Sequence, residues 1–88
     1  MKYEILDNII DSEIGEAYYL LNINTGKYLK LNASSMFIYN HVKKRDDDKF
    51  IINEIISKFN LSKDKAKKDF DVFISKAIKL KIMKKLDD

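Results

Sequence analysis

The spacing of apolar side chains changes near residue 32, and this change restricts the fold more than any other feature of the chain. Residues 16–23 form a run of mostly aromatic and aliphatic side chains, which is typical of a strand. A turn containing Gly26, whose backbone can adopt the left-handed conformation, separates this run from an expected return strand at residues 27–31. A shorter alternation of apolar and acidic residues predicts a strand at residues 3–6, whereas residues 7–15 are typical of a loop. We therefore expect the chain to begin with a small three-stranded antiparallel sheet.

Beyond residue 32, apolar residues recur every three or four positions, which predicts helices. The expected helices span residues 34–44, 49–59 and about 63–80, and residues 82–86 can add a short terminal strand. Their starts carry side chains that cap helices: Asn32 or Ser34, Asp47 or Asp48, and Ser62. The expected fold class is therefore α+β, a winged helix-turn-helix-like module in which an N-terminal three-stranded antiparallel sheet is followed by three helices.

The length and composition predict one small intracellular domain. With 88 residues, of which 45% are hydrophobic and 35% charged, the chain is typical of a single globular domain covering residues 1–88. It has no cysteine, so disulfides and thiolate metal sites are excluded and an intracellular setting is the default. The longest uncharged stretch, residues 31–42, is too short to span a membrane, and acidic residues interrupt the amino terminus where a signal peptide needs an apolar run. We expect a cytoplasmic protein with no membrane partner.

The sequence offers no set of side chains suited to catalysis. The single histidine, His41, is expected near the end of the first helix, where it can interact with the helix terminus but has no evident nucleophile to activate. The three consecutive acids at residues 46–48 lack the glycine and the terminal glutamate of a calcium loop and are better suited to helix capping. We therefore expect a protein that is not an enzyme, with no catalytic residues, no metal and no cofactor.

The expected outer strand, residues 27–31, would leave half of its backbone donors and acceptors unpaired. Such an edge can accept an extended peptide as a fourth strand, with main-chain hydrogen bonds supplying much of the affinity. If the last helix lies beside this edge, its apolar stripe of Phe70, Ile74 and Ala77 forms the other wall of a groove. The alternative for each of these apolar residues is a place in the core.

A DNA-binding winged helix is an alternative function. The formal net charge is +3, and the chain from residue 62 onward carries nine lysines against five acids. The lysines at the start of the last helix that could contact phosphates are Lys63, Lys65, Lys67 and Lys68. Acidic residues share this helix, and Arg45 is the only arginine although arginine makes the commonest specific base contact. Nucleic acid is therefore the less favoured partner.

A dimerisation module is the other alternative. The strand at residues 16–23 is apolar on both of its faces, with Ala17, Tyr19, Leu21 and Ile23 on one and Tyr18 and Leu20 on the other. Three helices can cover only one face of a small sheet, so the second face can expose a patch for a partner or a second subunit. A homodimer through the Tyr18 and Leu20 face is one such arrangement.

The order of these motifs resembles a known family. Residues 18–32 (YYLLNINTGKYLKLN) form its strand–turn–strand pattern, and the segments that follow match its three helices and final apolar pair: residues 33–39, 54–62, 69–74 and 82–83. In this order and spacing, nearly the whole chain resembles the PqqD-like family. Three positions depart from its pattern, because Ser35 and Lys81 stand where glycine is common and Tyr39 where tryptophan is frequent.

The resemblance implies a stand-alone recognition element for ribosomally synthesised and post-translationally modified peptides (RiPPs). Such proteins bind the leader of a precursor peptide along the third strand and against the third helix, and present it to a modifying enzyme: a radical SAM protein, a cyclodehydratase or a leader peptidase. Carried over residue by residue, the peptide-binding positions are Lys27, Tyr28, Leu29, Lys30 and Leu31 on the strand and Lys67, Phe70, Asp71 and Ile74 on the helix. By resemblance, Phe70 and Ile74 are expected to receive the apolar anchors of the leader, and the lysines to attract its acidic residues.

Overall fold

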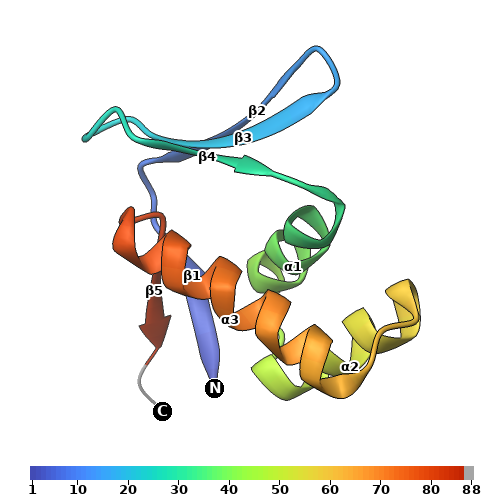
Figure 1. Cartoon of the computed structure of the whole chain (residues 1–88). Coiled ribbons are helices and arrows are strands. Elements are labelled where there is room, and N and C mark those ends of the chain that lie inside the picture. The colour runs from blue at the N-terminus through green and yellow to red at the C-terminus, as the bar shows by residue number, and fades with distance from the viewer. Residues whose placement is uncertain (87–88) are drawn as a thin grey trace.

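The computed structural model describes residues 1–86 and has an α+β architecture (Figure 1). The elements, in chain order, are β1 (Lys2–Ile5), β2 (Ile9–Ile14), β3 (Ala17–Asn22), β4 (Tyr28–Leu31), α1 (Ala33–Lys43), α2 (Asp48–Phe59), α3 (Lys63–Lys79) and β5 (Met83–Leu86). The predicted fold class is confirmed, because a three-stranded antiparallel sheet near the N-terminus precedes three helices. No helix in the described part of the chain is long and apolar enough to cross a membrane.

The three-stranded sheet has the order β2-β3-β4 and is antiparallel throughout. In the turn between β3 and β4, Gly26 has a φ of +75°, as the sequence predicts, and the Asn22 N–H donates to the Lys27 carbonyl at 2.9 Å. The turn between β2 and β3 has two residues, Gly15 and Glu16. Gly15 has a φ of +65°, which fits the tight hairpin turn that places glycine first.

Two details of the strand prediction are wrong. Residues 7–15, expected as a loop, contain β2. Asp11 and Glu13 of β2 face the same side of the sheet as the buried Leu20. Because charged residues stand where apolar ones are expected, the sequence lacks the alternation that predicts a strand. The strand expected at residues 3–6 does not join this sheet. It is β1, which pairs with the terminal strand β5 in a separate two-stranded sheet. The contacts of β1 with α1 and of β5 with α3 place this two-stranded sheet beside the helices.

Each helix begins at a side chain that the sequence marks as a cap. Asn32, Asp47 and Ser62 each accept a hydrogen bond from a backbone N–H in the first turn of α1, α2 and α3. Between the alternatives that the sequence left open, the structure therefore selects Asn32 and Asp47. The joint between α2 and α3 begins at Asn60, whose φ of +53° ends α2.

The core lies between the helices and one face of the three-stranded sheet. Its most deeply buried side chains come from the sheet, from all three helices and from the chain end before β5: Leu20, Ile38, Ile51, Ile55, Phe70 and Ile82. Tyr3 of β1 packs edge-on against Phe70 of α3, with ring centroids 6.1 Å apart. Figure 1 shows all three helices on the same side of the sheet, so its other face, which we call the outer face, is left without a helix.

Lys81 occupies a backbone conformation that favours glycine, which is also the residue common at this position in the family that the sequence resembles. Its φ is +58°, in the turn that joins α3 to β5. The left-handed conformation costs an L-residue about 1–2 kcal/mol, and glycine in turn loses about 0.5–1 kcal/mol of backbone entropy on folding. We therefore expect Lys81→Gly to raise the free energy of unfolding by about 0.5 kcal/mol.

Urea denaturation at 25 °C measures this difference, with Lys79→Gly as the matched control. Lys79 is the last residue of α3, so glycine there is expected to lower the free energy of unfolding by roughly 0.5–1 kcal/mol. Equal destabilisation by both substitutions would contradict the strain inferred at Lys81.

Candidate functional site

The outer edge of β4 has no neighbouring strand among residues 1–86. β4 pairs with β3 on one side only, and β5 pairs with β1 instead of covering this edge. Because Asn22 donates to Lys27, the backbone groups of residues 27, 29 and 31 point toward β3. The alternation of an antiparallel ladder then directs the N–H and C=O groups of Tyr28 and Lys30 outward. The predicted unpaired edge is therefore present, with two residues offering both a donor and an acceptor.

A groove of about 180 Å³ separates this edge from α3. Its strand-side wall consists of Leu29, Lys30 and the polar start of α1: Asn32, Ser34 and Ser35. Its helix-side wall consists of Lys68, Asp69, Val72, Phe73 and Lys76. Val72 is 45% exposed and Leu29 half-buried, so apolar surface on both walls is open to a guest chain.

The strand residues expected at the site lie at this edge, but they face different ways. Lys27 is in the turn before β4, and Leu29 and Lys30 line the groove. Leu31 is only 6% exposed and belongs to the core. Tyr28, which is 64% exposed, projects from the outer face of the sheet, opposite Leu21. The open edge is present as predicted, but not all of its side chains face α3: Leu29 does, whereas Tyr28 lies on the outer face.

The helix residues expected at the site, Lys67, Phe70, Asp71 and Ile74, are not among those that line this groove. Phe70 and Ile74 are 2% and 6% exposed and lie in the core. Lys67 and Asp71 form an ion pair with each other at 2.7 Å, and Lys67 lines a hollow beside α2. The physical reason is that the apolar stripe of a helix marks the side that packs on the core. The groove borders the next strip around α3, where Lys68, Val72 and Lys76 recur at four-residue spacing.

The groove carries excess positive charge. Lys68 and Lys76 lie in its helix-side wall, and neither forms an ion pair with another residue among 1–86. The one acidic residue in the wall, Asp69, is 2.9 Å from the Nζ of Lys65 and is therefore largely compensated. A guest chain with carboxylates would be attracted to this groove, although screening by salt weakens attraction by exposed lysines.

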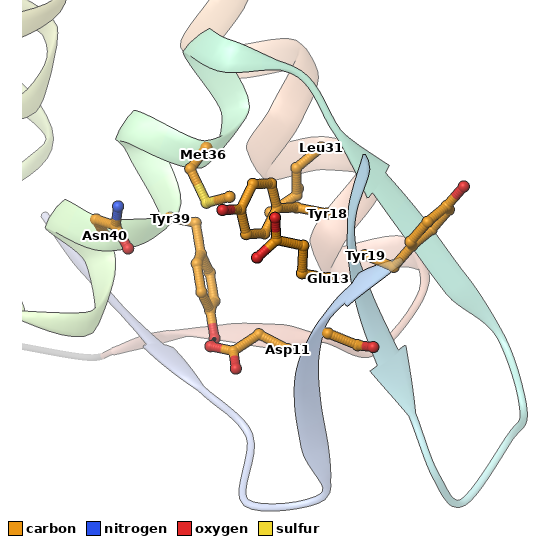
Figure 2. Close-up of a pocket in the computed structure, with 9 residues that line it drawn as sticks. Asp11, Glu13, Tyr18, Tyr19, Leu31, Met36, Tyr39 and Asn40 are labelled. Atoms are coloured by element: carbon orange, nitrogen blue, oxygen red, sulfur yellow. Dashed lines mark hydrogen bonds between the residues drawn. The ribbon is translucent and has the colours of Figure 1, made fainter. Parts of the chain in front are cut away.

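The other edge of the sheet, along β2, has the opposite charge. Figure 2 shows a hollow between β2 and α1 in which Glu13 and Tyr18 lie close to Met36, and Tyr39 donates a hydrogen bond to Asp11 at 3.1 Å. Burial, and then this hydrogen bond, raise the pKa of Tyr39, which keeps its phenol protonated as the donor. Charged side chains on the inner face of an edge strand are a known means of preventing further strand pairing. Asp11 also lies 3.5 Å from the Nζ of Lys43, so Glu13 is the carboxylate of β2 without an ion-pair partner among residues 1–86. This carboxylate disfavours an acidic strand at β2, so such a strand is favoured at β4.

The outer face of the sheet corrects the expected dimer surface. Leu20 is fully buried, and Tyr18, although 39% exposed, borders the hollow beside α1, so their face is the one that packs on the helices. The opposite face carries the more exposed apolar residues, which include Ile10, Ile14 and Tyr28. The prediction that one face of this sheet remains open is confirmed, but the open face is the one that carries Tyr19 and Leu21.

His41 and the acids at residues 46–48 serve the helix termini. His41 Nδ1 lies 2.7 Å from Asp46 Oδ2, Asp47 caps α2, and Asp48 is in its first turn. In the described chain, no group of three His, Cys, Asp or Glu side chains is arranged to hold a metal ion. The candidate site is therefore the groove between β4 and α3.

Comparison with known proteins identifies the family. The model of the family described as coenzyme PQQ synthesis protein D (PqqD) matches residues 17–82. The chain belongs to the PqqD family. This match spans the β3–β4 hairpin, the three helices and the turn that follows α3, and it confirms the resemblance found in the sequence.

Two solved structures share the fold of this PqqD-family chain. One is described as TbiB1 in complex with the TbiA(beta) leader peptide, with a TM-score of 0.82, 19% identity, and coverage of 97% of this chain and 99% of that one. The other is described as lasso peptide synthetase B1 complexed with the leader peptide, with a TM-score of 0.85, 13% identity, and coverage of 97% and 100%. No curated protein sequence matches the chain.

Proposed function

We propose that this chain, as one recognition domain over residues 1–88, binds the leader of a ribosomally made precursor peptide by strand addition to β4. The observation that carries the proposal is the open edge at Tyr28 and Lys30 beside a groove with an apolar floor and a basic rim. The leader peptides in the two structural relatives support the same class of ligand for this PqqD-family member. The role is non-catalytic, since binding alone accounts for the groove.

The bound peptide would use three kinds of contact. Its backbone would pair with the outward N–H and C=O groups of Tyr28 and Lys30, each hydrogen bond contributing about 0.5–1.5 kcal/mol net. An apolar side chain would fill the groove between Leu29 and Val72. Acidic side chains would approach Lys68 and Lys76, whose charges also steer the encounter. The revised peptide-binding set therefore keeps Lys27, Tyr28, Leu29, Lys30 and Leu31 as the strand segment and replaces the helix residues.

The second partner in this proposal is a modifying enzyme that receives the bound leader. A radical SAM protein, a cyclodehydratase and a leader peptidase are the classes that accompany PqqD-like recognition elements. A pulldown with a recombinant enzyme of each class distinguishes among them. If the immobilised protein retains more enzyme when the precursor is added, the result supports presentation of the leader to that enzyme.

Replacing the outward N–H of Lys30 tests strand addition directly. Lys30→Pro removes this donor without removing a hydrogen bond to β3, and edge strands tolerate proline. We expect Lys30→Pro to weaken binding of a synthetic leader peptide that the wild-type protein binds roughly three- to tenfold, measured by isothermal titration calorimetry. In the wild-type protein, the amide signals of Tyr28 and Lys30 should shift on titration.

Lys30→Ala is the matched control, because it removes the charge and keeps the backbone donor. We expect it to retain affinity within about threefold of the wild type. If both substitutions weaken binding equally, or if the amide signals of Tyr28 and Lys30 do not shift on titration, the peptide does not bind along the β4 edge.

DNA binding is less consistent with the arrangement of charges. Two of the four lysines expected to contact phosphates are paired within α3: Lys65 with Asp69 at 2.9 Å and Lys67 with Asp71 at 2.7 Å. Carboxylates therefore lie among these lysines and would repel the backbone of a duplex. Measurable duplex affinity with a steep salt dependence would favour the DNA reading over the peptide reading.

A further inference from the structure

The outer face of the sheet carries an aromatic pair beside the open edge. Tyr28 of β4 and Tyr19 of β3 meet edge to face with ring centroids 5.7 Å apart, and Figure 2 shows Tyr19 pointing away from the hollow on the helix side. Lys30 lies directly opposite Tyr19 in the register, so its side chain is on the same outer face. Tyr28 is 64% exposed although it is the largest side chain on the edge strand. Neither packing in the core nor the groove beside α3 explains this pair.

A strand added to β4 must present its side chains to both faces of the sheet. Successive side chains alternate, and directly opposed residues have Cβ atoms about 4.5–5.5 Å apart. The guest residue opposite Leu29 would therefore point into the groove, toward Val72 and Phe73. The guest residues opposite Tyr28 and Lys30 would lie on the outer face. These two positions are two residues apart in the guest whichever way it runs.

Resting on the proposed function, we propose that the sheet reads the peptide on both faces, with Tyr28 and Lys30 selecting side chains that the groove does not touch. Tyr28, backed by Tyr19, selects an aromatic or large apolar side chain, because aromatic pairs gain from edge-to-face contact. Lys30, which has no acidic partner in the described chain, selects a carboxylate. The peptide class is thus a three-residue pattern with an apolar central residue in the groove, flanked by one aromatic and one acidic residue.

The direction of the bound strand sets the order of this pattern. A guest parallel to β4 would read aromatic, apolar, acidic from its N-terminus, since Tyr28 precedes Lys30. An antiparallel guest would read acidic, apolar, aromatic. The same geometry excludes patterns in which the aromatic and acidic residues are adjacent, because these would face opposite sides.

Selection from a phage-displayed library of random twelve-residue peptides tests the pattern without knowledge of the precursor. On the wild-type protein, enriched peptides should contain an aromatic and an acidic residue two apart around an apolar one. On Lys30→Glu, a basic residue should replace the acidic one. On Tyr28→Ser, the aromatic preference should disappear while the central apolar residue is kept, and a wild-type-selected peptide should bind roughly three- to tenfold more weakly.

Two control variants match these changes in chemistry and lie away from the edge. Ile10→Ser removes an exposed apolar residue from the outer face of β2, and Lys58→Glu reverses an exposed charge on α2. Both should select the same peptides as the wild type. If enriched peptides shift the β4 amide signals but are unchanged by Tyr28→Ser and Lys30→Glu, the two-faced reading is wrong and strand addition stands. If no enriched peptide shifts those signals, the proposed function fails and this inference fails with it.

Discussion

Val72→Asp is expected to weaken leader binding at least tenfold. Val72 is the exposed apolar residue on the α3 wall of the groove, at 45% exposure, and a strand beside β4 would cover it. The substitution removes the apolar contact and forces a carboxylate to lose water against an apolar guest side chain. A tenfold loss corresponds to about 1.4 kcal/mol, which is within the range of these two effects combined. Isothermal titration calorimetry with the leader peptide measures the change.

Ile78→Asp is the matched control, because Ile78 is also an exposed apolar residue of α3, at 40% exposure, but does not line the groove. Its affinity should stay within about twofold of the wild type. Urea denaturation of both variants separates loss of the site from loss of the fold. If both substitutions weaken leader binding equally, or if folded Val72→Asp binds the leader as tightly as the wild type, α3 does not form part of the binding site.

The sequence predicts the buried side of α3 but not which of its exposed residues line the groove. The period of apolar residues identifies the core-facing side of a helix, and for α3 it correctly selects Phe70 and Ile74 as a stripe. Which flank of that stripe borders the β4 edge depends on how α3 lies against the sheet. Periodicity contains no information on this rotation, so Lys68, Val72 and Lys76 could not be distinguished from an ordinary solvated face.

Among the strands, too, only those defined by local sequence patterns were predicted correctly. β3 and β4 were predictable because their side chains and the glycine turn between them act locally. β2 was missed because Asp11 and Glu13 place charge on the helix side of an edge strand, where the usual alternation expects apolar residues. The pairing of β1 with β5 joins residues about 80 positions apart, and no local pattern encodes such a contact. Because β5 pairs with β1, β5 does not pair with β4, and the outer edge of β4 stays open.

Asn22→Leu is expected to lower the free energy of unfolding by about 2–4 kcal/mol. Asn22 is only 1% exposed, at the end of β3. Its side-chain Oδ1 accepts hydrogen bonds from the Asn8 side chain at 2.6 Å and from the N–H groups of Asn24 and Thr25 at 3.0 and 3.2 Å. Its Nδ2 donates to the carbonyl of Lys81 at 2.9 Å. A longer contact of 3.5 Å joins Nδ2 to the carbonyl of Leu80. Leucine fits the volume approximately but can replace none of these hydrogen bonds.

The hydrogen bonds of Asn22 join parts of the chain that are far apart in the sequence and that no local pattern of apolar residues connects. They connect the loop before β2, the turn before β4 and the turn between α3 and β5, so the hairpin that carries the open edge is held against the end of α3. Urea denaturation at 25 °C gives the stability change, with an unchanged m-value confirming the same unfolding transition. Asn53→Leu, at an exposed position of α2, is the control and should stay within about 0.5 kcal/mol of the wild type. A loss below 1 kcal/mol for Asn22→Leu would mean that water replaces these bonds, and that apolar packing alone fixes the β4 edge relative to α3.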